Sequence, residues 1–203
     1  SSNQSEHPHS ATSDTGLILR DNIYGSIEED AIRRDFTVNA LYYNIDDFAI
    51  YDFAQGLRDI QTKTLRLIGN PAERYKEDPV RMLRAVRFSS KLNFSIAKGS
   101  ASPIYEYGGL LKQIPSARLF DEILKLFLSA HAHNNYSLLR QFELFQYLFP
   151  SSEQLLNSKH PYINTLLEHA FRNTDQRIRN NKPVTPAYLL AALLWYPMRE
   201  EME

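Results

Sequence analysis

The chain of 203 residues contains no cysteine at all. This absence excludes disulfide bonds and thiolate metal sites, and it is typical of proteins from a reducing compartment. Long hydrophobic runs are also missing, since none reaches the roughly 18 residues that a helix needs to cross a bilayer. The first residues lack the charged and then apolar pattern of a secretory signal. We therefore expect a cytoplasmic protein with no membrane partner.

A large net charge is also absent. The 23 Lys and Arg residues nearly balance the 24 Asp and Glu residues, which gives a formal net charge of −1. The balance is uneven along the chain, because ten Lys or Arg but only four Asp or Glu lie between Arg58 and Lys98. This local excess of six positive charges suits an anionic partner.

The first third of the chain has the patterns of a small αβ unit. Residues 1–16 are polar with almost no apolar anchor, which predicts a disordered lead-in. Ser26 and Glu29 have the spacing of a capping box, so a short helix should run to about Arg34. Further on, the patterns predict a hairpin with strands at Asn39–Asn44 and Ala49–Phe53, then a helix at Leu57–Thr64 and a strand at Leu65–Ile68.

Helical periodicity dominates the chain from Pro71 onward, where we find no convincing strand. Further prolines lie at or near the expected starts and breaks of helices. The expected helices are Val80–Leu92, about Ser102–Gln113, about Ala117–Ala130, about Asn135–Phe149, about Tyr162–Arg179, and Pro186 to the end.

These patterns together predict an α+β fold that is mostly α. We expect three parts: the lead-in at 1–16, an αβ part at 17–70 and an all-helical part at 71–203. A sheet of two or three short strands has exposed edges and needs further strands to be stable. We therefore expect that segments upstream of Ser1 belong to the same folding unit.

The most informative stretch is Arg74–Phe88. Its Asp-Pro step favours a helix start at Asp78, because aspartate can cap free N–H groups and proline suits the first helical position. From there Arg81, Arg84 and Arg87 follow at every third position and form one charged face. The other face of the same helix is apolar and should meet the core through Pro79, Met82, Leu83 and Val86.

Three arginines on one face repel one another unless an anion or acidic side chains lie among them. Arginine offers a planar fork of donors to phosphate oxygens or to a base edge, and aspartate accepts from an exocyclic amino group. Asp78 and Arg81 could therefore read a nucleobase together, while the other arginines hold phosphates. The alternative is a structural cap with salt bridges to nearby acids, namely Glu73, Glu77 or acids elsewhere in the fold.

Three motifs follow one another in the sequence: Arg33–Leu41, then Asp52 with Gly56 and Asp59, and then Glu77–Phe88. In this order and spacing they resemble those of class II nucleotidyltransferases, the family of bacterial poly(A) polymerases and CCA-adding enzymes. The resemblance implies that the αβ part is a partial nucleotidyltransferase head and that the helices are its neck and body. Two further stretches are more similar to the poly(A) polymerase branch, Leu19–Ala31 and Ile114–Lys125.

The resemblance also implies roles for particular residues. Arg34 would contact the incoming nucleotide, with Asp35 as an active-site, catalytic acid beside it. The alternative for Asp35, which follows two arginines, is an internal ion pair with a structural role. Asp78 would accept from the 6-amino group of ATP, and Arg81 would donate to ring N1. A cytosine edge could face the same pair, so this reading does not separate ATP from CTP. The phosphates would be held by Arg84 and Arg87.

Four other motif residues have simpler interpretations. We expect Gly56 to supply backbone freedom near the junction of head and neck. Asp52 and Asp59 are expected to fix turns. Asn39 is expected to bond the backbone with its side chain and not the substrate.

Nucleotidyl transfer of this kind uses two divalent metals, here Mg²⁺, held by carboxylates. In the resembling family these come from a Gly-Gly-x-x-Arg-Asp segment and an Asp-x-Asp strand. This sequence has no Asp-x-Asp, and its one Gly-Gly pair, Gly108–Gly109, is not followed by Arg-Asp. His131 and His133 lack the acidic neighbours of a metal site. We thus expect an amino-terminally truncated piece without a metal site, inactive by itself.

The implied function is the addition of adenylates from ATP to RNA 3′ ends, in mRNA polyadenylation and RNA turnover. RNA 3′ ends, ATP and RNA-decay proteins would be its partners. One alternative is a CCA-adding tRNA nucleotidyltransferase. Another is a non-catalytic helical module that binds RNA phosphates through Arg58–Lys98, with strong salt dependence and no preference for ATP over UTP.

Overall fold

The structure is a computed structural model and describes residues 26–202. Helices form most of it, and the few strands are short, which confirms the predicted fold class. In chain order the elements are α1 (Ile27–Arg33), η1 (Thr37–Asn39), β1 (Leu41–Tyr43), β2 (Ile50–Asp52), α2 (Gly56–Gln61), β3 (Thr64–Leu65), α3 (Pro71–Glu77), α4 (Val80–Leu92), β4 (Ser95–Ile96), α5 (Lys98–Tyr107), η2 (Gly108–Gln113), α6 (Ser116–Phe127), α7 (Ala132–Gln141), α8 (Phe145–Leu148), α9 (Pro150–Asn157), α10 (Ile163–Arg179) and α11 (Pro186–Met202).

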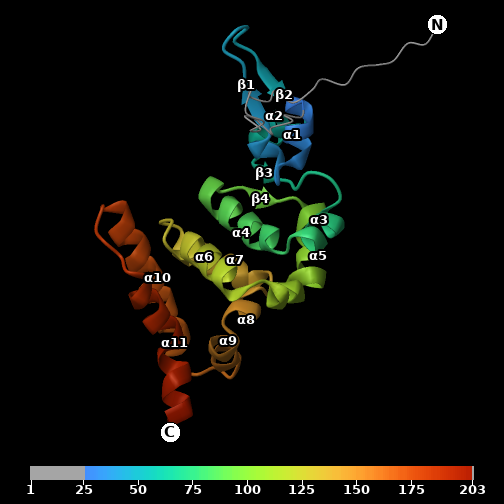
Figure 1. The fold of residues 1–203 in the computed structure, drawn as a ribbon. Coiled ribbons are helices and arrows are strands. Elements are labelled where there is room, and N and C mark those ends of the chain that lie inside the picture. Colours follow the sequence, from blue (N-terminus) through green and yellow to red (C-terminus); the bar gives the residue numbers. More distant parts are fainter. Residues whose placement is uncertain (1–25, 203) are drawn as a thin grey trace, which may run out of the picture.

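The elements are arranged roughly in chain order along the molecule (Figure 1). The β1–β2 hairpin, α1 and α2 form one end, the helices α3 to α9 follow, and α10 and α11 lie at the other end. None of the helices within residues 26–202 is both long and apolar enough to cross a membrane. The lead-in expected at 1–16 lies outside the described residues.

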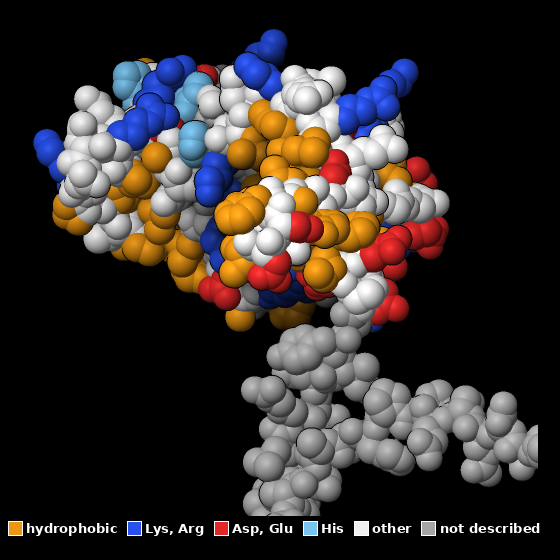
Figure 2. All heavy atoms as spheres, turned by 90° about the horizontal axis from the view of Figure 1, so that it is seen from above, with side chains coloured by type: hydrophobic (Ala, Val, Ile, Leu, Met, Phe, Trp, Pro, Cys, Tyr) orange, Lys and Arg blue, Asp and Glu red, His pale blue; other side chains and the backbone are white. Residues whose placement is uncertain are grey.

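The predicted capping box and hairpin are both present. The Ser26 hydroxyl accepts from the Glu29 backbone N–H at 3.2 Å, and the Glu29 carboxylate accepts from the Ser26 N–H at 3.0 Å. Strands β1 and β2 are antiparallel, with Leu41 opposite Asp52. Seen from above this end, hydrophobic side chains lie exposed among acidic ones (Figure 2). The most exposed of the hairpin are Tyr43, Ile45, Phe48 and Ile50.

The prediction that no strand follows Pro71 is wrong. β4 pairs in parallel with β3, and its neighbour Ala97 donates its N–H to the Leu65 carbonyl at 2.9 Å. The turn that brings β4 there depends on Asn93, which ends α4 with a positive φ of 54°. Asparagine tolerates this left-handed conformation better than most residues. A strand of two residues is too short to show alternation in the sequence.

Several helix boundaries also differ from the predictions. α4 begins at Val80 and not at Asp78, because a residue before proline avoids the α region and Asp78 is extended (φ −145°, ψ 94°). Glu143, with φ 58°, separates α7 from α8 where one helix was expected. Two helices were not predicted at all, α3 and α9.

One main hydrophobic core runs through the helical part. Met82, Leu83 and Val86 of α4 are fully buried in it, as the apolar face of this helix predicted. The same core includes Phe36 and Leu65 from the αβ part. The core therefore includes residues from both sides of the predicted boundary at residue 70, and that boundary stays a prediction.

Candidate nucleotide-binding site

The residues next to Asp35 in the chain fix its position beside α4. Its carbonyl accepts from the Ile68 N–H at 2.9 Å, and the Thr37 N–H donates to the Arg66 carbonyl at 3.0 Å. Phe36 is buried, with its ring 5.6 Å from that of Phe88 in edge contact. A backbone pairing and an apolar anchor therefore fix the position of the Asp35 carboxylate.

The Asp35 carboxylate joins two of the three arginines of α4. Its Oδ1 lies 3.0 Å from Nε of Arg81, and its Oδ2 lies 2.6 Å from Nε of Arg84. The side chains of Asp35 and Arg81 are each only 14% exposed. The salt bridges agree with the structural interpretation of the arginine face. The three arginines still outnumber the one carboxylate of Asp35, so the positive charge that the nucleotide interpretation needs is also present.

Arg81 makes further bonds through one of its two terminal nitrogens. Nη1 donates to the Arg74 carbonyl at 2.8 Å and to the Glu77 carboxylate at 3.1 Å. Within residues 26–202, Nη2 of Arg81 makes no hydrogen bond. Arg81 is thus held in place with one pair of N–H donors free.

Arg74 ties the first motif to α3. Its Nη2 donates to the carbonyls of Arg33 and Arg34, at 3.0 and 2.8 Å, and its Nη1 pairs with Glu77 at 3.2 Å. Arg74 therefore positions the backbone on which the predicted nucleotide contacts lie. Its role was not predicted.

A cavity of about 490 Å³ lies beside this cluster, lined by both motifs. The buried Nε of Arg87 donates no hydrogen bond within the described residues, whereas the buried Nε of Arg84 lies 2.6 Å from Oδ2 of Asp35. Arg87 lies over the Phe88 ring, 5.1 Å from its centre. Unused guanidinium donors favour an anion at this place. The lining residues are Arg33, Arg34, Asp35, Asn39, Arg84 and Phe88.

Asp78 lies between α3 and α4 and has a partner that was not predicted. Its Oδ2 accepts from Nη2 of Arg118 at 2.7 Å, and its Oδ1 accepts from the Val80 N–H at 3.2 Å. Arg118 lies in the first turn of α6, where the helix dipole disfavours a cation. A cation in the first turn of a helix is the sequence signal that indicates an acidic partner or an anion here.

The side chain of Arg34 has partners of its own, separate from the contact between Arg74 and the Arg34 backbone carbonyl. Its guanidinium pairs with Asp30 at 2.8 Å and lies over the Tyr42 ring, 6.0 Å from its centre. Hydrogen bonds from Tyr42 and then Arg34 hold the pKa of Asp30 below its ordinary value. Half of the Arg34 side chain remains exposed at the cavity, so it can still meet a ligand there.

Two simpler interpretations need correction. Within the described residues, the Asn39 side chain makes no hydrogen bond, to backbone or otherwise, and it lines the cavity. Gly56 has no positive φ, so backbone freedom is not its purpose. A Cβ at Gly56 would lie 2.4 Å from the Thr37 carbonyl oxygen, so the position requires the absence of a side chain.

Asp59 and Asp52 both have structural contacts. Asp59 is buried, accepts from the Thr37 hydroxyl at 2.7 Å and pairs with Arg66 at 3.0 Å, so it joins η1 to the segment after β3. Asp52 accepts from the N–H groups of Gly56 at 2.8 Å and Leu57 at 2.9 Å. It therefore fixes the turn into α2, as expected.

Replacing Asp52 with alanine should lower the free energy of unfolding at pH 7 by about 1 kcal/mol, the usual cost of losing a helix cap. Burial raises the pKa of Asp52, but backbone N–H donors outweigh burial, so its pKa lies below the ordinary value. A depressed pKa stabilises the fold above the unfolded-state pKa of about 4, and this contribution is lost as the pH falls through the folded-state pKa. Urea unfolding at pH 7 and pH 3 should show a difference that shrinks in acid. A cost independent of pH would contradict this.

Carboxylates suited to a metal are not gathered at the site. Among residues 26–202 there is no group of three or more His, Asp or Glu side chains that could hold a metal ion. The described residues therefore do not fit a metal centre, and we assign no step to a metal here.

The mostly helical fold with a few short strands is shared with solved CCA-adding enzymes, which are nucleotidyltransferases. Solved structures of a CCA-adding enzyme in complex with CTP and with ATP each match with a TM-score of 0.67 and 28% identity, over 83% of this chain and 40% of that chain. A family model described as the poly(A) polymerase head domain matches residues 1–66, and one described as a probable RNA- and SrmB-binding site of polymerase A matches residues 93–161. The chain belongs to the poly(A) polymerase family.

Two curated relatives place the chain within that family. Poly(A) polymerase I of Salmonella typhimurium is 48% identical over 198 residues, which cover 97% of this chain and 43% of that protein. The CCA-adding enzyme of Enterococcus faecalis is 36% identical over 129 residues, 64% of this chain and 32% of that protein. The chain thus spans less than half the length of these relatives.

Proposed function

We propose that this chain is the nucleotide-selecting and RNA-binding part of a polynucleotide adenylyltransferase, which adds adenylates from ATP to RNA 3′ ends in mRNA polyadenylation and RNA turnover. The observation that carries the proposal is the arginine face of α4 beside a cavity shared by both motifs, where the buried Nε of Arg87 has no acceptor within the described residues. Phosphate oxygens are the acceptors that such forks match best.

Asp78 and Arg81 are proposed to read the base. Both Asp78 oxygens already accept one hydrogen bond, but each carboxylate oxygen has a second lone pair, so the adenine amino group can be added without breaking a bond. The free Nη2 of Arg81 can donate to adenine N1. Uracil presents a carbonyl where adenine has its amino group, which the Asp78 carboxylate would repel. This arrangement favours ATP over UTP.

Arg84 and Arg87 are proposed to hold phosphates, with Arg34 at the edge of the cavity. Asp35 has a different part from that of a general base, since each of its oxygens is paired with an arginine. We assign it the role of a positioning residue that fixes the relative positions of the Arg81 and Arg84 guanidinium groups. Mg²⁺, which the family's chemistry needs, would have to be held by carboxylates other than those described.

Replacing Arg81 with alanine should weaken ATP binding about tenfold or more, because a hydrogen bond from a charged donor contributes about 1.5–3 kcal/mol. Isothermal titration calorimetry with ATP and with UTP measures this directly, with far-ultraviolet circular dichroism to confirm folding. Arg172→Ala is the matched control, because Arg172 is an exposed arginine of α10. Equal ATP affinity in the Arg81→Ala variant would remove the assigned role.

A CCA-adding enzyme is the second candidate, because an enzyme of that kind is solved with both CTP and ATP in a similar fold. The greater identity and coverage of the poly(A) polymerase relative support the first candidate. Incorporation of labelled ATP and CTP by the complete protein separates the two. A module that binds RNA alone would instead show salt-dependent RNA affinity and no ATP binding.

A further inference from the structure

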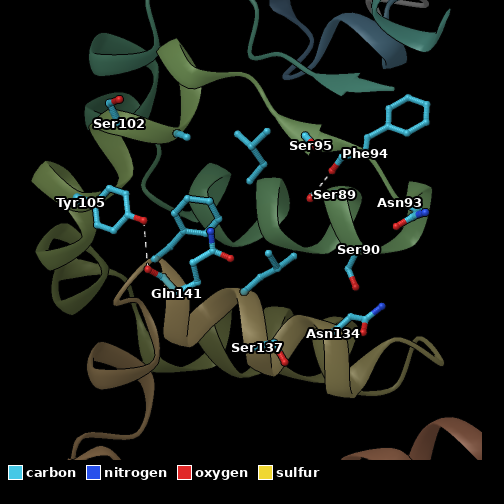
Figure 3. A pocket seen from close by; sticks show the side chains of 14 residues that line it. Ser89, Ser90, Asn93, Phe94, Ser95, Ser102, Tyr105, Asn134, Ser137 and Gln141 are labelled. Atoms are coloured by element: carbon cyan, nitrogen blue, oxygen red, sulfur yellow. Dashed lines mark hydrogen bonds between the residues drawn. The ribbon is translucent and has the colours of Figure 1, made fainter. Parts of the chain in front are cut away.

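A second cavity, of about 580 Å³, opens where the end of α4 meets β4, α5 and α7 (Figure 3). It shares no lining residue with the arginine-lined cavity. Its size lies within the range of small-molecule sites. None of the fourteen residues that line it within the described chain is charged. An ion therefore has no counter-charge here, and a neutral polar group fits better.

The cavity contains polar side chains that have no partner. Ser90 is 6% exposed, and its hydroxyl makes no hydrogen bond within residues 26–202. Figure 3 shows Ser90 on α4 across from Asn134 and Ser137 on α7. The side-chain amides of Asn134 and Gln141 likewise make no hydrogen bond to the described residues. A buried hydroxyl without a partner is costly, so a ligand that bonds to it is favoured.

Two aromatic rings in contact lie beside these amides. Tyr105 is 48% exposed as a residue, and its ring packs against that of Phe142, with ring centres 5.5 Å apart. Its hydroxyl donates to the backbone carbonyl of Gln141 at 3.2 Å. This bond fixes the ring next to the Gln141 side chain (Figure 3). An exposed and oriented ring next to free amides suits a flat aromatic ligand with a polar edge, because the ring stacks and the amides bond.

The kinds of side chain in the cavity favour one base. Amides of Asn and Gln match the donor and acceptor on the adenine edge, arginine or lysine matches guanine, and carboxylates match cytosine. The cavity has three amides, of Asn93, Asn134 and Gln141, and its lining includes none of the charged types. We propose that this cavity binds an adenine base of the RNA that is being extended. This inference rests on the proposed function, and most of the lining lies in the segment matched by the RNA-binding model.

The test measures binding of fluorescently labelled decamers of adenylate and of cytidylate to the whole chain by fluorescence anisotropy. The double variant Asn134→Ala, Gln141→Ala removes two exposed amides and should keep the fold. Its affinity for the adenylate decamer should fall about tenfold, with little change for the cytidylate decamer. Gln176→Ala is the matched control, since Gln176 is an exposed amide of α10 outside the cavity.

A second variant, Ser90→Ala, keeps the proposal falsifiable if the double variant folds poorly. It should weaken binding of the adenylate decamer severalfold without lowering the melting temperature, because the hydroxyl has no partner to lose. Unchanged affinity in both variants would overturn the proposal, and so would an equal loss for the two decamers.

Two further arms separate this inference from the proposed function. ATP affinity should stay unchanged in these variants, because the arginine-lined cavity is not altered. Unchanged decamer binding together with Arg81-dependent ATP binding would sink the adenine cavity and leave the proposed function intact. Adenosine serves as the probe for a free nucleoside, and binding of adenosine without binding of the decamer would overturn the assignment to RNA.

Discussion

Replacing Asp35 with alanine is expected to lower the free energy of unfolding by about 2–3 kcal/mol. Breaking a buried ion pair by removing one partner costs about 3–5 kcal/mol, because the other charge stays buried. The Arg84 side chain is 35% exposed, so solvent screens part of that cost and reduces it to about 2–3 kcal/mol. Urea unfolding at neutral pH measures the change.

The same variant should regain stability when an anion is added. Without Asp35, Arg81 and Arg84 repel each other, and inorganic triphosphate can take the place of the carboxylate. We expect triphosphate to raise the unfolding midpoint more in the Asp35→Ala variant than in the unmodified chain. Asp121→Ala is the control, since Asp121 is an exposed residue of α6. If triphosphate raised the unfolding midpoint of the Asp35→Ala variant no more than that of the Asp121→Ala variant, Asp35 would not position the arginines.

Replacing Gly56 with alanine is expected to destabilise the fold by about 2–3 kcal/mol, the upper part of the usual range for overpacking. The new Cβ would lie 2.4 Å from the Thr37 carbonyl oxygen and 3.2 Å from a methyl group of Leu41. A backbone carbonyl cannot rotate away as a flexible side chain can, so α2 and η1 must separate. Thermal or urea unfolding gives the size of the effect.

Gly99→Ala is the matched control for this change. Apart from the adjacent residues and the backbone of its own helix, no atom of the described residues lies within 4 Å of a Cβ at Gly99, which is in the first turn of α5. Alanine there should leave stability unchanged or raise it by up to about 1 kcal/mol, because it restricts the unfolded chain. Equal effects of the two substitutions would show that the close approach at Gly56 has no cost.

The arginine face of α4 was the part of the site best predicted from spacing. Positions three apart on a helix define a face whatever the rest of the fold does, so its charged and apolar sides followed from the sequence. The joining of Asp35 to Arg81 could not follow, because 46 residues separate them and only the tertiary fold brings them together. The resemblance to a family assigned both residues to a nucleotide site but did not predict their ion pair.

Other features were outside the reach of local patterns. Asn93 in its left-handed conformation decides where β4 lies, yet an asparagine at the end of a helix is compatible with many turns. The contact of Arg118 with Asp78 joins α6 to the segment between α3 and α4, across 40 residues. Periodicity describes one element at a time, and such contacts are properties of pairs of elements.

The burial of Phe36 in the helical core has a consequence for how the protein responds to mutation. Because Phe36 and α4 share one hydrophobic cluster with the helices around them, we expect the proposed nucleotide site to be present only while that cluster is folded. A substitution in the distant core, at Phe171 for example, would reduce the fraction of molecules able to bind ATP without touching a single contact of the site. By the same linkage, saturating nucleotide would partly restore the helices of such a variant.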